Sequence, residues 1–309
     1  IKVLCFLLAV TAFGNANAQH QIRSFSMLGK QINQYERTDF EIQVNAQFNN
    51  PFLQEDIALD MLLITPSGKK LVLPCFFGAA QADHKSSWSA RFLPQESGRY
   101  EYYFRLKKEG KIVDEGKTSK FMAVAADRKG ILHKNDDWTF RYDNGTLYRG
   151  LGENLAWESR DHDDSKFFSA LHENKKYNYD DMLPNLAKNG GDYFRTWICS
   201  WNLPLDWRRD FNNSRYEPSD EYFNPSAIKR MDHLVNLSDS LGLHMMLTLG
   251  GGTHDAKHGR YETTMADFFV DPKAKAQYQN RLRFIVARWG YSPALGAWEF
   301  FNEIDNVQF

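Results

Sequence analysis

The chain has 309 residues, of which 42% are hydrophobic and 25% are charged, so it can bury a sizeable core, and its length suggests about two domains. The formal net charge is −1. Without a basic face the chain lacks the electrostatic footprint of a nucleic-acid-binding protein, and we expect no nucleic-acid partner.

The first residues, IKVLCFLLAVTAFGNANAQ, have the three-part pattern of a secretory signal peptide. Lys2 provides a positive start, residues 3–13 form an apolar run, and Ala16-Asn17-Ala18 forms a cleavage site. The run is shorter than the ~20 residues that span a bilayer. The alternative to a signal peptide is a buried N-terminal strand. We expect residues 1–18 to be a signal peptide cleaved after Ala18, and the mature protein to be secreted or periplasmic with no membrane span.

Residues 20–125 are predicted to form an immunoglobulin-like β-sandwich. In FEIQVNAQF, residues 40–48, the apolar side chains recur at every second position, which indicates a strand with one buried face. The segment ALDMLLITPSGKKLVLP is typical of two strands joined by a Pro-Ser-Gly turn. Roughly seven short strands over ~100 residues favour the sandwich. The segment contains no catalytic constellation.

Cys75 and Cys199 lie in different predicted domains, so we expect free or buried thiols and no disulfide.

Residues 126–309 have a different pattern, in which strands alternate with helices. A hairpin is expected around Asp143-Asn144-Gly145, and helices are expected over 180–188, after Asn224-Pro225 and after Asp271-Pro272, since Asn or Asp before Pro is a helix start signal. Alternation of this kind predicts βαβ units and a parallel sheet. The four predicted strands are LYRGLGENLAW, YFRTWICSW, LHMMLTLGGG and LGAWEFFNE.

The segment YQNRLRFIVARWGYSPALGAWEFFNEID resembles the fourth helix and strand of clan A glycoside hydrolases, in particular of cellulase- and β-mannanase-like members. The N-terminal part resembles the immunoglobulin-like domain of unknown function that often precedes such barrels in bacterial enzymes. The resemblance implies that residues 126–309 are the first four βα units of a (β/α)8 TIM barrel. The fold class is therefore expected to be multidomain, an all-β sandwich followed by a partial barrel.

Active sites of such barrels lie at the carboxyl ends of the strands. The resemblance implies that Glu303 is the general acid/base and that Asn302 hydrogen-bonds the sugar 2-hydroxyl; the alternative for Glu303 is a solvated or salt-bridged loop carboxylate. Arg195, in YFRTW, matches the arginine that such barrels place beneath the catalytic carboxylates, and could instead be a core arginine paired with Glu299. His254, in GGGTHD, follows strand three where the family often places a substrate-contacting polar residue. Because side chains alternate along a strand, we expect residues 299, 301, 303 and 305 to share one face until the strand ends.

Aromatic residues cluster at the ends of the first two predicted strands. Indole rings can cover the apolar C–H faces of sugars while the N–H bonds a hydroxyl. We expect two of the tryptophans to line a cleft and the others to be core, with Tyr261 as a further platform. The tryptophans in question are Trp157, Trp197, Trp201 and Trp207.

No metal or cofactor is expected. His254 and His258 have i, i+4 spacing but lack the H-E-x-x-H pattern and a third ligand. The acidic RDHDDS segment lacks the EF-hand spacing and is read as a solvated loop. The expected partner is a polysaccharide or oligosaccharide substrate, and the sequence leaves the oligomeric state open.

A barrel needs eight strands and ~250 residues, whereas only four strands are predicted here. The retaining mechanism requires a second carboxylate at about 5 Å as nucleophile, and in the resembling families that Glu closes strand seven. The chain also starts with Ile rather than Met. We therefore expect a fragment that is inactive alone and that associates through the unpaired edge of its fourth strand.

The leading hypothesis is a secreted retaining glycosidase acting on a β-linked polysaccharide such as β-mannan or β-glucan. The alternative is a non-catalytic glycan-binding protein on the same scaffold, which would keep the tryptophans and lack the strand-seven Glu. A third reading, an unrelated α/β enzyme with a chance Asn-Glu pair, predicts no tryptophan-lined groove at the strand ends.

Overall fold

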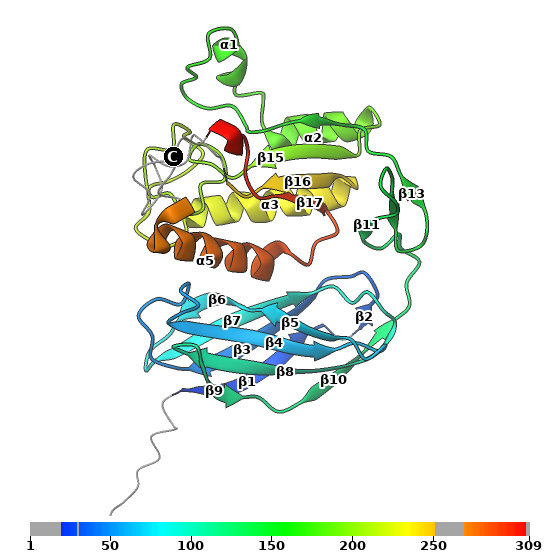
Figure 1. Cartoon of the computed structure of the whole chain (residues 1–309), viewed down its shortest axis with the longest axis vertical. Coiled ribbons are helices and arrows are strands. Elements are labelled where there is room, and N and C mark those ends of the chain that lie inside the picture. The colour runs from blue at the N-terminus through cyan, green and yellow to red at the C-terminus, as the bar shows by residue number, and fades with distance from the viewer. Residues whose placement is uncertain (1–19, 30, 251–268, 307–309) are drawn as a thin grey trace, which may run out of the picture.

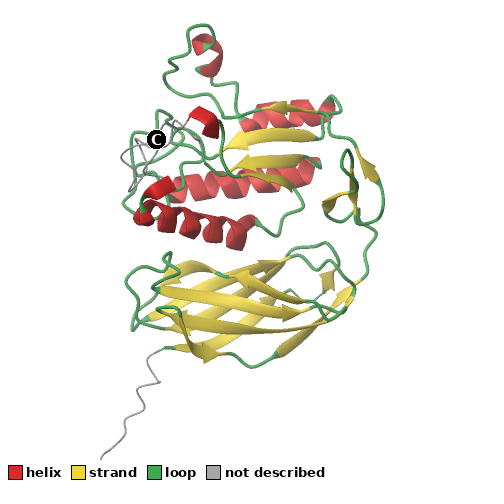
Figure 2. Cartoon of the chain, in the orientation of Figure 1, coloured by secondary structure: helices red, strands yellow, loops and turns green. Residues whose placement is uncertain are grey.

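The computed structural model describes residues 20–29, 31–250 and 269–306. In Figure 1 a two-layered β-structure lies below a unit in which helices cover a parallel sheet. Figure 2 shows that all the strands of the lower part are joined by loops, and that the longer helices belong to the upper part.

The lower part contains ten strands, against roughly seven expected, because several are short edge segments. One sheet has the order β1-β3-β7-β6; the other has the order β2-β10-β8-β4-β5, with β9 beside β8. The strands are β1 (Gln21–Leu28), β2 (Ile32–Asn33), β3 (Thr38–Asn45), β4 (Ile57–Ile64), β5 (Lys70–Pro74), β6 (Phe76–Ala80), β7 (Lys85–Phe92), β8 (Gly98–Lys108), β9 (Lys111–Glu115) and β10 (Ser119–Val124).

A single apolar core joins the two sheets, and it follows the predicted two-residue period. Phe40, Ile42 and Val44 of β3 are buried in it together with side chains of β4 and β8 from the other sheet. This confirms the expected strand for residues 40–45; β3 ends at Asn45, short of the predicted residue 48. The two-layer arrangement is thus that of a sandwich, whereas its assignment as immunoglobulin-like stays a prediction.

A small antiparallel sheet follows, formed by β11 (Leu132–Lys134), β12 (Phe140–Tyr142) and β13 (Leu147–Tyr148). Its turn lies at the predicted place, where Gly145 has a φ of 86° that glycine tolerates without strain. The Tyr142 hydroxyl lies 2.7 Å from Nε2 of His244, the first residue of a parallel strand. The hairpin therefore lies against the amino ends of the parallel strands, as Figure 1 shows.

The upper part is a four-stranded parallel sheet with strands in sequential order. One face packs against α2, α3 and α5 in a common core that contains Phe194, Met245 and Leu247 from the strands. The opposite face presents Arg195 and Thr248. The elements are β14 (Gly152–Asn154), α1 (Ser169–His172), α2 (Tyr179–Lys188), β15 (Tyr193–Trp197), α3 (Pro225–Leu241), β16 (His244–Thr248), α5 (Pro272–Trp289), β17 (Leu295–Glu299) and the 3₁₀ turn η3 (Ile304–Asn306).

Both predicted helix starts are confirmed. The Asn224 side chain accepts hydrogen bonds from the backbone N–H groups of Ser226 and Ala227, and the Asp271 side chain accepts one from Lys273. Each cap satisfies donors that the first helical turn leaves without a partner. These caps fix where α3 and α5 begin.

The Cys75 and Cys199 thiols are both buried and form no disulfide with each other, as expected. Within residues 20–29, 31–250 and 269–306, no helix is long and apolar enough to cross a membrane. The predicted signal peptide, residues 1–18, lies outside the described residues.

Candidate functional site

The carboxyl end of the parallel sheet is organised around Arg195. Its Nε and one terminal nitrogen each donate to a carboxylate oxygen of Glu299 at 2.6 Å, a two-pronged ion pair. The same terminal nitrogen donates to Oδ1 of Asn302 at 2.8 Å, and the other donates to Oδ1 of Asn154 at 3.3 Å. One guanidinium thus joins the ends of β14, β15 and β17.

Glu299 is held ionised by its surroundings. Burial alone would raise its pKa, but the hydrogen bonds from Arg195 and Thr248 outweigh that effect and hold the pKa below the ordinary carboxyl value. Thr248 Oγ1 donates at 2.8 Å from the end of β16. The geometry therefore shows Arg195 paired with Glu299, as the alternative reading of this arginine expects.

The predicted fourth strand is too long. Strand β17 ends at Glu299, and the chain then turns so that the Asn302 N–H donates to the Gly250 carbonyl at 3.1 Å. The expected alternation through residues 301 and 303 is therefore wrong, because residues 300–306 contain no strand. Glu303 lies in the turn with a left-handed φ of 48° and is exposed, and Asn302 is buried.

Asn302 has an unused donor. Its Oδ1 accepts from Arg195, which fixes the orientation of the amide, while its buried Nδ2 has no hydrogen-bond partner among the described residues. A buried donor without a partner is costly. Trp197 Nε1 is in the same condition, and the Trp197 ring lies 5.0 Å beneath the Arg195 guanidinium.

Three of the four candidate tryptophans form one cluster beside Arg195. Trp157 packs edge-to-face against Trp197 at 5.1 Å and against Trp201 at 5.8 Å. The Arg160 guanidinium lies over both the Trp157 and the Trp201 rings. Trp197 is buried, and the Trp157 and Trp201 rings are half-buried against it, so the three rings form a small aromatic core at the carboxyl end of β15.

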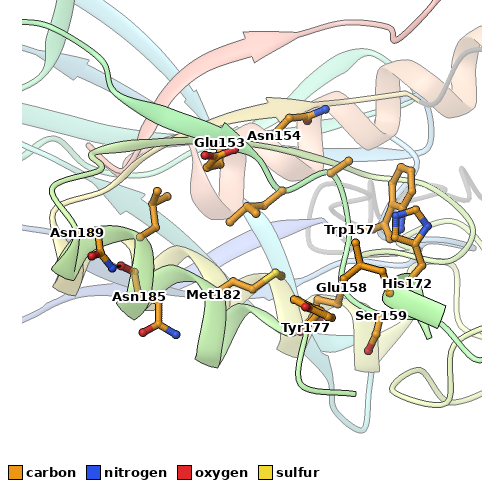
Figure 3. A pocket seen from close by; sticks show the side chains of 14 residues that line it. Glu153, Asn154, Trp157, Glu158, Ser159, His172, Tyr177, Met182, Asn185 and Asn189 are labelled. Atoms are coloured by element: carbon orange, nitrogen blue, oxygen red, sulfur yellow. Dashed lines mark hydrogen bonds between the residues drawn. The ribbon is translucent and has the colours of Figure 1, made fainter. Parts of the chain in front are cut away.

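A cavity of about 700 Å³ lies next to this cluster, between β14 and α2. Figure 3 shows Trp157 and His172 together at one end of it and Asn185 and Asn189 at the other. Asn154, which accepts from Arg195, also lines the cavity. The cavity and the Arg195 cluster are therefore adjacent.

The remaining candidates do not join this site. Trp207 is only 2% exposed and belongs to the core between sheet and helices, where the Arg281 guanidinium covers its ring. A sugar cannot reach it, so its assignment to substrate binding is wrong. His254, His258 and Tyr261 lie outside the described residues.

Sequence reasoning missed a buried charged cluster in the loop after β14. The Asp163 side chain is fully buried and accepts from Arg160 Nε at 2.7 Å, while its carboxylate lies 2.7 Å from Nδ1 of His172. Burial raises its pKa, but these partners outweigh burial and hold the pKa well below the ordinary value. The acidic RDHDDS segment is thus an internally paired loop. Within the described residues no group of acidic, His or Cys side chains is suited to hold a metal.

Comparisons with known proteins agree with this architecture. A family described as "Domain of unknown function (DUF5060)" matches residues 31–107, within the sandwich. Two curated relatives are 26% identical: mannan endo-1,4-beta-mannosidase A of Podospora anserina over 131 residues, and mannan endo-1,4-beta-mannosidase F of Aspergillus fumigatus over 145 residues. Each match covers 40% of this chain, and 35% and 30% of those proteins, so the chain spans about a third of the length of the curated relatives it matches.

A solved structure of a candidate glycoside hydrolase from Bacteroides vulgatus superposes with a TM-score of 0.57 and 18% identity. The superposition covers 90% of this chain and 50% of that one, and shows that the fold of the two parts is shared. The chain is therefore similar to proteins named as glycoside hydrolases in sequence and in fold.

Proposed function

We propose that this chain is part of a secreted glycoside hydrolase, in which residues 20–125 form an immunoglobulin-like domain and residues 126–309 form the first four βα units of a (β/α)8 barrel. Four parallel strands in sequential order, with helices on one face, are the arrangement from which such barrels are built. The similarity to two named mannosidases supports a β-linked polysaccharide, such as a mannan, as the substrate class.

The observation that carries the proposal is the hydrogen bond from Arg195 to the Asn302 side-chain oxygen. It fixes the amide and leaves, directly before Glu303, an N–H that has no partner in the part of the chain that the structure describes. Once exposed to substrate, that buried donor would be satisfied by a sugar hydroxyl, and the resulting contact would hold the glycosidic oxygen near the Glu303 carboxyl. Trp157 of the adjacent cluster is half-buried and lines the cavity, so it offers part of the apolar surface that sugar rings require.

In the proposed retaining mechanism Glu303 acts twice. It first donates its proton to the glycosidic oxygen while a second carboxylate attacks the anomeric carbon, so that the leaving group departs neutral and a glycosyl-enzyme forms. Glu303 then takes a proton from water as that water attacks the anomeric carbon and releases the nucleophile. The second carboxylate would come from the protein beyond residue 309. Asn302 and Arg195 position the substrate and the turn.

The test is hydrolysis of β-mannan and β-glucan by the complete natural protein and by two matched variants. Glu303→Gln removes the proposed acid/base, and Asp305→Asn makes the same change in an exposed carboxylate two residues away. We expect Glu303→Gln to lose about 10²–10⁴-fold in kcat on natural polysaccharide and Asp305→Asn to stay near wild type. Tight glycan binding without turnover by the wild-type protein would instead identify a glycan-binding protein.

A further inference from the structure

Helix α5 lies between the β-sandwich and the parallel sheet (Figure 1). Its buried residues include Asn280, Arg281 and Phe284, so polar as well as apolar side chains of this helix are enclosed. A helix that contacts both parts can make the position of the parallel sheet depend on the position of the sandwich.

The loop between β3 and β4 of the sandwich contacts the middle of α5. Asn280, 1% exposed, accepts from the backbone N–H of Gln54 at 2.9 Å and donates to the Glu55 carboxylate at 3.1 Å. The Phe52 ring packs edge-to-face against Phe284 at 5.8 Å and also contacts the rings of Tyr222 and Phe223, so the loop is inserted into the core of the upper part.

A second contact involves a buried carboxylate of the sandwich. Asp60, in β4, accepts from Arg283 of α5 at 2.6 Å and from Lys107 of β8 at 3.0 Å. Arg283 also donates to the Leu59 carbonyl at 3.0 Å. Since removing one partner of a buried charge pair is strongly destabilising, the two parts are held together by contacts that specify one geometry.

The opposite side of the same helical turns holds the strand ends. Arg281 donates to the Leu249 carbonyl, just past β16, at 3.2 Å. The Tyr278 hydroxyl donates to the Phe300 carbonyl, just past β17, at 3.0 Å, and the Tyr278 ring stacks on Phe301 at 5.2 Å. These contacts fix the backbone directly before Asn302.

We propose that the β-sandwich is a brace for the turn that carries Asn302 and Glu303, acting through α5. The path runs from the Phe52–Glu55 loop to Asn280, through one helical turn to Tyr278 and Arg281, and on to the carbonyls of Phe300 and Leu249. The sandwich is thus a positioning part of the active half rather than an independent glycan-binding module. The consequence for catalysis rests on the proposed function, whereas the mechanical coupling does not.

The test is hydrogen exchange in peptides covering residues 244–250 and 295–306, which contain the Leu249 and Asn302 amides bonded to the Glu299 and Gly250 carbonyls. Asn280→Asp keeps the size of the side chain but turns an oxygen toward the Glu55 carboxylate. Because an unmatched buried group costs a large fraction of a folded element's local stability, we expect exchange there to rise at least about tenfold. Adding Glu55→Gln gives the new carboxylate a donor and should restore exchange to within about twofold of wild type.

Tyr100→Phe is the control, because it removes hydrogen bonds that lie wholly within the sandwich, between the Tyr100 hydroxyl and the Glu96 backbone. It should leave exchange in residues 295–306 unchanged. Phe52→Leu is a second interface variant, for the case in which Asn280→Asp does not fold. The proposal is overturned if the interface variants loosen only residues 50–56 and 272–289, or if Tyr100→Phe speeds exchange at the strand ends equally.

In the complete protein, Asn280→Asp should lower kcat about tenfold with KM within about twofold, because positioning affects the transition state more than ground-state binding. Absence of hydrolysis by the wild-type protein would refute the proposed function, and the exchange experiment would still decide whether the sandwich braces the turn.

Discussion

Replacing Arg195 by Met tests the centre of the site most severely. The substitution keeps an unbranched side chain but removes both donors to Glu299 and the donor to Asn302. Glu299 would then keep only the Thr248 hydroxyl as a hydrogen-bond partner among those described.

The magnitude follows from the burial of the pair. The side chains of Arg195 and Glu299 are 15% and 24% exposed. Breaking a fully buried pair costs about 3–5 kcal/mol, and an exposed pair contributes about 0–1 kcal/mol. A largely buried, two-pronged pair with some solvent access falls between these limits, and we expect Arg195→Met to lower the free energy of unfolding by about 2–3 kcal/mol.

The assay is urea unfolding of the chain, arranged as a double-mutant cycle with Glu299→Gln. Arg195→Met, which leaves a charge without its partner, should cost more than the double variant, in which the neutral amide needs no counter-ion. Arg209→Met, which affects an exposed ion pair with Asp220, should cause little change. If the two single effects add to the double effect within about 0.5 kcal/mol, the claim that Arg195 and Glu299 are coupled as an ion pair is refuted.

Two further predictions concern the scaffold. The Asp232 carboxylate accepts hydrogen bonds from Arg288 and Trp289. Burial raises the pKa of Asp232, but these bonds outweigh burial and hold the pKa below its ordinary value of 3.8. The ionised carboxylate therefore stabilises the folded protein fully above the pKa that Asp232 has in the unfolded chain, and this stabilisation is lost as the pH falls. The free energy of unfolding, measured with urea, should therefore fall less for Asp232→Asn than for wild type between about pH 5 and pH 3. An equal fall in both proteins over that range would contradict this prediction. Trp207→Ala should cost about 3–5 kcal/mol as a core cavity with glycan affinity unchanged; a loss of affinity at unchanged stability would show that Trp207 binds substrate.

Local signals in the sequence were sufficient to locate the helices. Asn224-Pro225 and Asp271-Pro272 start helices because a short polar side chain can bond the free N–H groups of the first turn and Pro lacks an N–H that needs a partner. These interactions span only a few residues, so a single segment contains all the information. The period of two in residues 40–48 was predictable for the same reason.

The site depended on interactions that no local pattern contains. Strand β17 ends early because Asn302 turns back to the Gly250 carbonyl and Tyr278 holds the Phe300 carbonyl, partners that lie 22 or more residues away in the sequence. Trp197 is the last residue of β15, whereas Trp207 lies in the loop between β15 and α3 and is buried in the core between sheet and helices. Asp163 pairs with Arg160 within the same acidic segment, but its other partner, His172, reaches it only because the loop folds back on itself.

The most direct test of the role of Glu303 uses the complete protein with Glu303→Ala, an aryl β-glycoside with a good leaving group, and azide. Such a leaving group needs no general acid, so the glycosyl-enzyme should form and then accumulate, because water is no longer deprotonated. Azide needs no deprotonation, so the account predicts that it restores turnover and yields the β-glycosyl azide. Full turnover without azide, or an α-glycosyl azide, would contradict it.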